Sequence, residues 1–102
     1  MSDLTIEKTE ATEGVKFNVI GRITTVNENY FDKILSDARD EGFNHIVLNM
    51  REVTLMTSIG IRIILKTYKG CVEAGGKFQI EDPSEVVKNV LGLSALQQMM
   101  VD

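Results

Sequence analysis

The stretch of residues 45–65, HIVLNMREVTLMTSIGIRIIL, constrains the fold of this chain more than any other. The apolar run over residues 46–50 has the length and the Ile/Val/Leu content of a strand buried on both faces. A polar pair, Arg51-Glu52, and a short run over residues 53–56 follow, and a helical pattern begins at Ile59. Ser58 therefore lies where a strand delivers the chain to the start of a helix.

This position gives Ser58 two possible roles. A hydroxyl before a helix can cap it by accepting a backbone N–H. The same place gathers free N–H groups and the positive end of the helix dipole, so it also suits an anion or a phosphate. The prediction of function depends mostly on which role Ser58 has.

The helix that follows Ser58 has two unlike sides at about 100° per residue. An ordinary core stripe is predicted for Ile61, Ile64, Leu65, Tyr68, Cys71 and Val72. Ile59 and Ile63 lie one turn apart on the opposite side, beside Arg62 and Lys66. They are either two scattered surface isoleucines or an exposed apolar pair with a basic rim, which is the composition of a docking surface. We expect Cys71 to serve packing.

The first part of the chain predicts a hairpin and a helix. Alternation over residues 4–9 and 15–20, around a polar turn, is typical of two antiparallel strands. The candidate caps of the helix are Thr24, Thr25 and Asn27, and Gly42 suits its left-handed end. Its predicted apolar stripe consists of Val26, Tyr30, Phe31, Ile34, Leu35 and Ala38.

The last part predicts a strand over residues 78–81 and a helix that starts at residues 82–85 and ends at Gly92. Residues 93–100 add one or two helical turns. Strands separated by a helix are best joined by right-handed parallel crossovers. We therefore expect a single small α/β domain over residues 1–102, with a mixed four- to five-stranded sheet, an antiparallel first hairpin, parallel crossovers and helices mainly on one face.

Composition narrows the function classes. With 43% hydrophobic and 25% charged residues, the chain has the make-up of a globular domain, and it contains no apolar run of about 20 residues. The N-terminus has no secretion signal, and the single cysteine excludes an internal disulfide. We expect a cytoplasmic protein. The net charge of −4 and the lack of a basic run argue against nucleic acid and against an anionic membrane surface as partners. The lack of a long apolar run argues against direct insertion into a membrane.

Signals for catalysis are weak. His45 is the only histidine and stands at the mouth of a strand, where a structural role is expected. One His and one Cys cannot form the common metal sites, and the glycines at 70, 75 and 76 match no phosphate-cradling loop. We predict no enzyme activity, no catalytic residues, no metal and no cofactor.

Four motifs in register resemble the STAS domain, the fold of bacterial anti-sigma factor antagonists. Residues 46–65 resemble its signature, an apolar strand followed by Asp-Ser-Ser/Thr-Gly-Leu at a helix start. Residues 21–24 correspond to the Gly-Glu-Leu-Asp motif of the family, and Gly75-Gly76 corresponds to the Gly-Gly before its fourth strand. Residues 90–96 match its closing Leu-x-x-x-Gly-Leu pattern. The resemblance covers roughly residues 4–100.

The resemblance implies a mechanism of partner switching. In this family the Ser directly after the Asp is phosphorylated by a kinase that is itself an anti-sigma factor, and that Ser corresponds to Ser58. The unmodified antagonist binds the kinase and frees the sigma factor, so transcription is regulated. A phosphate adds close to two negative charges, which is costly inside a partner contact. A serine phosphatase is a further partner of such a switch.

Three positions depart from the family pattern. Thr57 replaces the signature Asp, Ile59 replaces the second Ser/Thr, and Thr24 replaces the acid of the first loop. Thr57 is a second candidate for phosphorylation. The partner-binding surface implied by the resemblance consists of Thr24, Thr25, Met56, Thr57, Ser58, Ile59, Gly60, Arg62, Ile63 and Lys66.

Two alternatives remain. The lost acids and Ile59 favour a constitutive STAS scaffold or an accessory subunit of a sensory or transport assembly, which is not phosphorylated. The free N–H groups at the start of the second helix would suit a small-molecule or nucleotide site, although no Gly-rich loop supports it.

Overall fold

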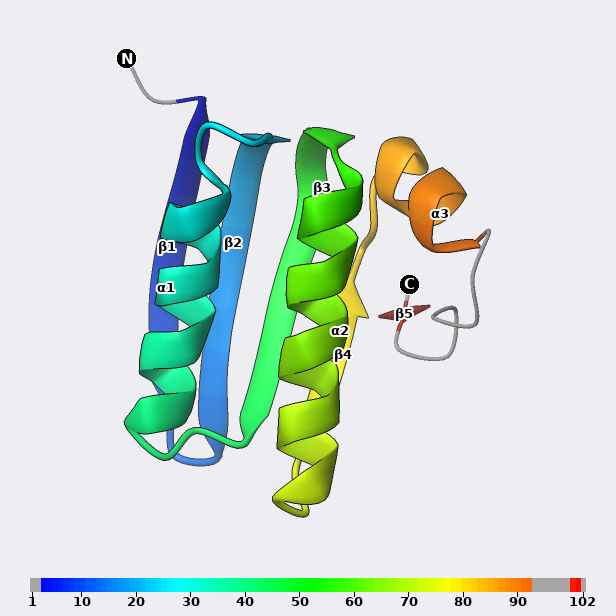
Figure 1. Ribbon diagram of the computed structural model, residues 1–102. Coiled ribbons are helices and arrows are strands. Elements are labelled where there is room, and N and C mark those ends of the chain that lie inside the picture. The colour runs from blue at the N-terminus through cyan, green and yellow to red at the C-terminus, as the bar shows by residue number, and fades with distance from the viewer. Residues whose placement is uncertain (1–2, 93–99, 102) are drawn as a thin grey trace.

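The computed structural model describes residues 3–92 and 100–101, and within them it contains a sheet and three helices (Figure 1). In chain order the elements are β1 (Leu4–Ala11), β2 (Gly14–Ile23), α1 (Glu28–Asp40), β3 (His45–Met56), α2 (Ser58–Glu73), β4 (Lys77–Glu81), α3 (Glu85–Gly92) and β5 (Met100–Val101).

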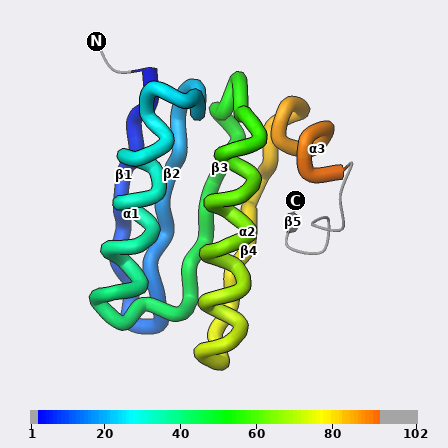
Figure 2. Tube along the Cα trace, in the orientation of Figure 1, coloured from blue at the N-terminus to red at the C-terminus, as the bar shows by residue number. Residues whose placement is uncertain are grey.

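The sheet has the strand order β1-β2-β3-β4-β5. β1 pairs with β2 antiparallel, and the later strands pair parallel. Because parallel strands are added in one direction by crossovers of the usual right hand, α1 and α2 lie side by side on one face of the sheet (Figures 1 and 2). The mixed sheet and the hairpin are as predicted.

The core lies between this face and the two helices. Phe17, Leu48 and Ile80 are paired across β2, β3 and β4, and all three are fully buried. The alternate residues Val47 and Asn49 are only half-buried. The prediction that residues 46–50 are buried on both faces is therefore wrong, because α1 and α2 cover one face only.

The other face carries a polar cluster on three neighbouring strands. The Lys16 ammonium lies 2.6 Å from Oε2 of Glu81, and Nδ2 of Asn49 donates to the same oxygen at 2.8 Å. The hydrogen bond from Lys16, and after it the one from Asn49, holds the pKa of Glu81 below its usual range. Such a cluster suits a solvated sheet face.

The polar pair Arg51-Glu52 does not interrupt β3. The strand runs on to Met56, and its register against β2 shifts between Asn18 and Ile20. An extra residue in one strand of a pair is left unpaired while the strand continues, and Arg51 and Glu52 are exposed at this shift. β4 ends opposite Asn49, so the rest of β3 extends beyond it, and α3 packs there.

The first helix begins later than its apolar pattern predicts. Val26 is 90% exposed and Tyr30 is 43% exposed, so both are wrongly assigned to the buried stripe, whereas Phe31, Leu35 and Ala38 are buried. Val26 belongs to the loop before α1, where helical periodicity does not apply. Gly42 has a φ of 95°, as expected for a residue that ends a helix in the left-handed conformation.

The second helix is rotated relative to the prediction. Its buried residues are Gly60, Ile63, Ile64, Thr67 and Cys71. Ile63 is only 6% exposed, so its placement on the surface is wrong, while Val72, predicted to be buried, is half exposed. The small residues Gly60 and Thr67, which an apolar count omits, face the core. Because α2 packs against α1 as well as the sheet, its apolar arc extends to Ile63.

The end of the chain contains a third helix and a short strand. Oγ of Ser84 accepts the N–H of Val87 at 3.3 Å, so Ser84 caps α3, which starts where the sequence predicts. The predicted final helical turns fall mostly on residues 93–99, which lie outside the described residues. Met100–Val101 forms β5 rather than helix and pairs with β4.

Candidate functional site

The candidate site lies where β2 and β3 end beside each other. Ile23 pairs with Met56, and the N–H of Thr57 donates to the carbonyl of Ile23 at 3.2 Å. The loop before α1 and the start of α2, which are far apart in sequence, are thereby neighbours. In open α/β sheets ligands bind outside the carboxyl ends of parallel strands. We call this end of the sheet the carboxyl edge.

The loop before α1 is held by Asn27. Its Oδ1 accepts the N–H of Thr24 at 2.9 Å, and its Nδ2 donates to the carbonyl of Arg22 at 2.8 Å. Asn27 occupies the N-cap position of α1, but its side chain makes no capping bond to the helix. The amide therefore fixes the loop, and Val26 projects at the loop's tip.

The two hydroxyls at the start of α2 differ in access. Thr57 is the N-cap residue in extended conformation, and its side chain does not cap the helix. Its Oγ1 is buried and has no hydrogen-bond partner among the described residues. Ser58 is the first residue of α2 and is exposed. Of the two candidate acceptors, only the Ser58 hydroxyl is open to a modifying enzyme in this conformation.

The start of α2 also has an uncompensated positive end. The first N–H groups of a helix have no partner within it, and here no side chain caps them. The first turn contains no acidic residue. The helix dipole at Ser58 is therefore free to interact with an added negative charge.

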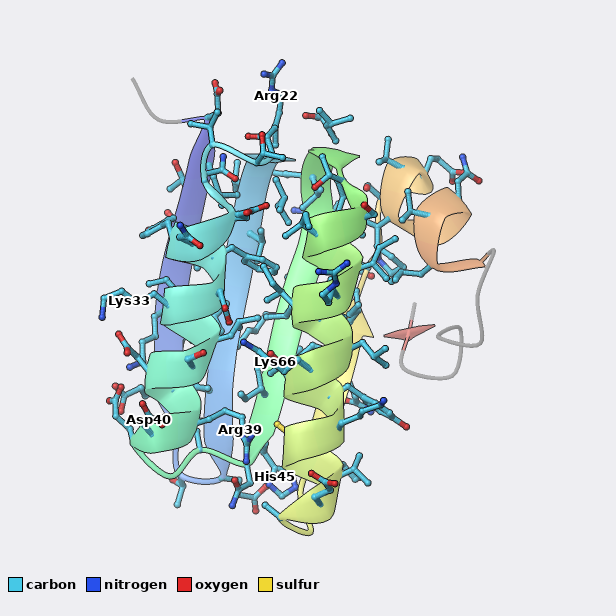
Figure 3. The ribbon with its side chains drawn as sticks, in the orientation of Figure 1. Arg22, Lys33, Arg39, Asp40, His45 and Lys66 are labelled. Carbon is cyan, nitrogen blue, oxygen red and sulfur yellow. The ribbon has the colours of Figure 1, made fainter. Side chains whose placement is uncertain are left out.

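A groove of about 230 Å³ lies between the first turns of α1 and α2. Ile59 and Ile63 form its apolar part. Lys66, labelled on α2 in Figure 3, lies with its Nζ 2.6 Å from Oδ1 of Asp32 on α1. Glu28, Asn29 and Arg62 complete the lining. Oε2 of Glu28 is buried and has no hydrogen-bond partner in the described part of the chain.

The predicted partner-binding residues are gathered at this edge but divide by exposure. Thr25, Ser58, Arg62 and Lys66 are exposed, and Thr24, Thr57 and Ile59 are half-buried. Met56, Gly60 and Ile63 are buried, so a partner could not use them as an open surface. A Cβ on Gly60 would lie 2.7 Å from Cγ of Met56, which explains the glycine by close packing.

Two residues of the site were not found from the sequence. The helical pattern places Val26 in the core stripe, and it carries no signal for Glu28. Asn27 is the signal that could have located both, because an Asn at the N-cap places the residue before it in a loop and the next one in the first helical turn. Glu28 supplies a carboxylate to the groove that Ile59 and Arg62 also line.

The single histidine and the single cysteine of the chain lie away from the carboxyl edge. His45 begins β3 at the opposite end of the sheet and is exposed. Cys71 is buried in the core, which raises the pKa of its thiol, and its predicted packing role is confirmed. Within residues 3–92 and 100–101, no three His, Cys, Asp or Glu residues are grouped to hold a metal ion. No helix in the same part of the chain has both the length and the apolar content to span a bilayer.

Comparison with solved structures shows the same fold in other proteins. The chain is similar to the anti-sigma factor antagonist SpoIIAA in its unphosphorylated form, with 20% identity, a TM-score of 0.85 and coverage of 96% of this chain and 87% of the other. It is similar to Bacillus SpoIIAA in the phosphorylated form, with 21% identity, a TM-score of 0.79 and coverage of 97% and 89%.

A third similar structure is the murine Slc26a9 anion transporter, with 15% identity and a TM-score of 0.70. The similarity covers 88% of this chain and 15% of the transporter. At these identities the likeness shows the fold, which occurs both as a small protein and as a part of a large one.

The sequence profile of one family covers nearly the whole chain. The STAS domain matches residues 5–101. This match contains the carboxyl edge, both helices beside it and the strands that position them. The chain therefore belongs to the STAS domain family.

Proposed function

We propose that this domain is a non-catalytic partner-switching protein of the anti-sigma factor antagonist type. In its unmodified form it binds a serine kinase that is also an anti-sigma factor, in the cytoplasm of a bacterium. The kinase transfers a phosphoryl group from a nucleoside triphosphate to Oγ of Ser58, and the modified protein leaves the complex. A serine phosphatase restores the unmodified form.

The observation that carries this proposal is the exposed hydroxyl of Ser58 at the uncapped start of α2. The neighbouring hydroxyl of Thr57 is buried, so Ser58 is the favoured acceptor. The free N–H groups and the dipole tolerate a phosphate in the folded domain. The same dianion within a partner contact would be desolvated and would repel acidic groups, so one modification can weaken binding while the fold is kept.

The surface that we assign to the partner differs from the sequence prediction. Its apolar contacts are the exposed Val26 at the loop tip and the half-buried Ile59 in the first turn of α2. Thr24, Thr25, Thr57 and Ser58 supply the polar rim, and Arg62 and Lys66 supply positive charge. Met56, Gly60 and Ile63 support this surface from the core. Apolar contacts with a polar rim are the composition of an interaction site.

The test uses the tagged protein expressed in its own cells. The Ser58→Ala variant should retain a bound protein that phosphorylates Ser58 of the natural chain, and Ser58→Asp should lose it by at least about tenfold. Val26→Asp should also lose it, while Val72→Asp serves as the matched control, because Val72 is an exposed valine near the far end of α2. Equal binding by the Ala and Asp variants at position 58 would contradict the proposal.

A second candidate is a constitutive STAS scaffold or an accessory subunit of a sensory or transport assembly. The replacement of both signature acids by Thr24 and Thr57 favours it, and so does the occurrence of this fold within the Slc26a9 transporter. For such a scaffold, Val26→Asp would still abolish binding, but Ser58→Asp would leave it unchanged. The pair of variants therefore separates the two functions.

A further inference from the structure

Arg62 lies one helical turn after Ser58, on the same side of α2. Residues four apart on a helix have Cβ atoms about 5–6 Å apart. Helical side chains lean toward the N-terminus of their helix. The side chain of Arg62 is therefore long enough to reach the turn that begins with Ser58.

Both side chains are exposed, and both are available. Arg62 makes no ion pair or hydrogen bond from its side chain within residues 3–92 and 100–101. Lys66, the other cation of α2 that lines the groove, is already paired with Asp32 at 2.6 Å. Arg62 is thus the cation of this groove that has no internal partner.

The surroundings leave few competitors for Arg62. Thr57 and Ile59, on either side of Ser58, are uncharged, and the first turn of α2 has no acidic residue. Across the groove, α1 presents Glu28 and Asp32, and Asp32 is occupied by Lys66. A carboxylate at position 57 would repel a phosphate on Ser58, but this chain has none there.

We propose that Arg62 is the positioning residue that binds the phosphate of modified Ser58. This inference rests on the proposed phosphorylation of Ser58 and adds how the modified state is held. A negative group four residues before a cation is the favourable order on a helix, and a guanidinium can donate two parallel hydrogen bonds to phosphate oxygens. The phosphate thereby removes Arg62 from the partner surface at the same time as it adds negative charge.

The test places phosphoserine at position 58 during synthesis of the full chain, so that no kinase is needed. The pH dependence of the ³¹P chemical shift gives the pKa of the second phosphate ionisation, ordinarily about 6. This pKa should be higher in the Arg62→Gln variant by about 0.3 units, a roughly twofold change in proton affinity. Arg62→Lys should retain part of the effect, and the difference should shrink in 1 M salt.

Lys66→Gln is the matched control, because it removes one cation from the same helix two turns from Ser58. It should leave the phosphate pKa unchanged, and equal shifts in the two Gln variants would overturn the proposal in favour of a diffuse field. A second measurement needs no variant. The Nε–H resonance of Arg62 should shift and exchange more slowly with solvent when Ser58 carries the phosphate, and an unchanged resonance would also overturn it.

The proposed phosphorylation of Ser58 and the proposed role of Arg62 can be refuted independently. If cells never phosphorylate Ser58, the proposed function is wrong, but the coupling to Arg62 in the synthetic phosphoprotein stands. If the phosphate is present in cells but its pKa does not respond to Arg62→Gln, only the role of Arg62 is wrong.

Discussion

The two ends of the sheet are built differently. At the end opposite the site, polar backbone groups are paired: the N–H of Gly76 donates to Cys71, and that of Lys77 donates to Asn44 at 2.9 Å. At the carboxyl edge, Oε2 of Glu28 and Oγ1 of Thr57 are buried without partners, and neither helix has a side-chain cap. A third buried unpartnered atom in the described chain, Nε of Arg39, belongs to the last turns of α1.

We interpret this difference as a division between residues that stabilise the fold and residues that serve the proposed function. Unpaired buried polar groups and missing caps each cost free energy of folding. Two of the three unpartnered atoms in the described chain lie at the carboxyl edge, together with the two helix starts that have no side-chain cap. The paired end serves the fold. At the carboxyl edge the start of α2 has no side-chain cap and Val26 is exposed, which are the features that the proposed partner contact uses.

The largest expected effect concerns the boundary between core and surface at this edge. Ile63→Ala should lower the free energy of unfolding by about 3 kcal/mol, because Ile63 is buried between α2 and its neighbours. Val26→Ala is the control and should change it by less than about 0.5 kcal/mol, since Val26 is exposed. Urea unfolding measures both values. Similar losses in the two variants would refute the division of the edge into support and surface.

A smaller loss is expected at the opposite end of the sheet. Gly76→Ala should destabilise the protein by about 2 kcal/mol, because a Cβ there would lie 2.0 Å from the backbone oxygen of Asn44. Gly42→Ala has open space but keeps a φ of 95°, so it should cost about 1 kcal/mol. Thermal and urea unfolding give the comparison. A Gly76→Ala variant more stable than Gly42→Ala would show that this end is not tightly fitted.

The contribution of the paired carboxylate of Glu81 to the free energy of unfolding should depend on pH. Glu81→Gln should cost up to about 1 kcal/mol at neutral pH, as expected for a part-exposed ion pair with Lys16. The folded-state pKa of Glu81 is lowered, so its contribution is complete above the ordinary value of about 4.3. It is lost as the pH falls through the lower folded-state pKa. Unfolding of both proteins between pH 7 and pH 2 should show the difference vanish in acid, and a constant difference would contradict this.

The smallest effect concerns the unpartnered hydroxyl of Thr57. Thr57→Val keeps the shape and removes a buried oxygen without a partner, so it should be neutral or stabilise by up to about 1 kcal/mol. Thr67→Val is the matched control, since its Oγ1 donates to the carbonyl of Ile63 at 2.9 Å, and it should not stabilise. If Thr57→Val destabilised the protein more than Thr67→Val, the hydroxyl at 57 would have an unseen partner.

The sequence predicted the order of elements through residue 92 and the topology of the sheet, because alternation, helical periodicity and turn residues are local signals. Predictions from the sequence were wrong where tertiary contacts determine the orientation, length or exposure of an element. The orientation of α2 depends on Gly60 and Thr67, which no apolar count includes. The length of β3 depends on a register shift against β2 that tolerates Arg51 and Glu52. The exposure of Val26 depends on the hydrogen bonds of Asn27.

The candidate site was predicted in part for the same reason. Ser58 at a strand-to-helix junction is visible in the sequence, and so is its neighbourhood with Arg62 one turn later. The neighbourhood of Glu28 and Ile59 in one groove requires α1 and α2 to pack side by side, which no local pattern specifies.

The central claim is that Ser58 is the switch of the carboxyl edge. The most direct test is intact mass with site mapping on the protein isolated from its own cells, in growth and under stress. We predict a population that carries one phosphate located on Ser58. Phosphate on Thr57 alone would contradict the assignment of the acceptor, and the absence of phosphate under all conditions would contradict the switch and favour the constitutive scaffold.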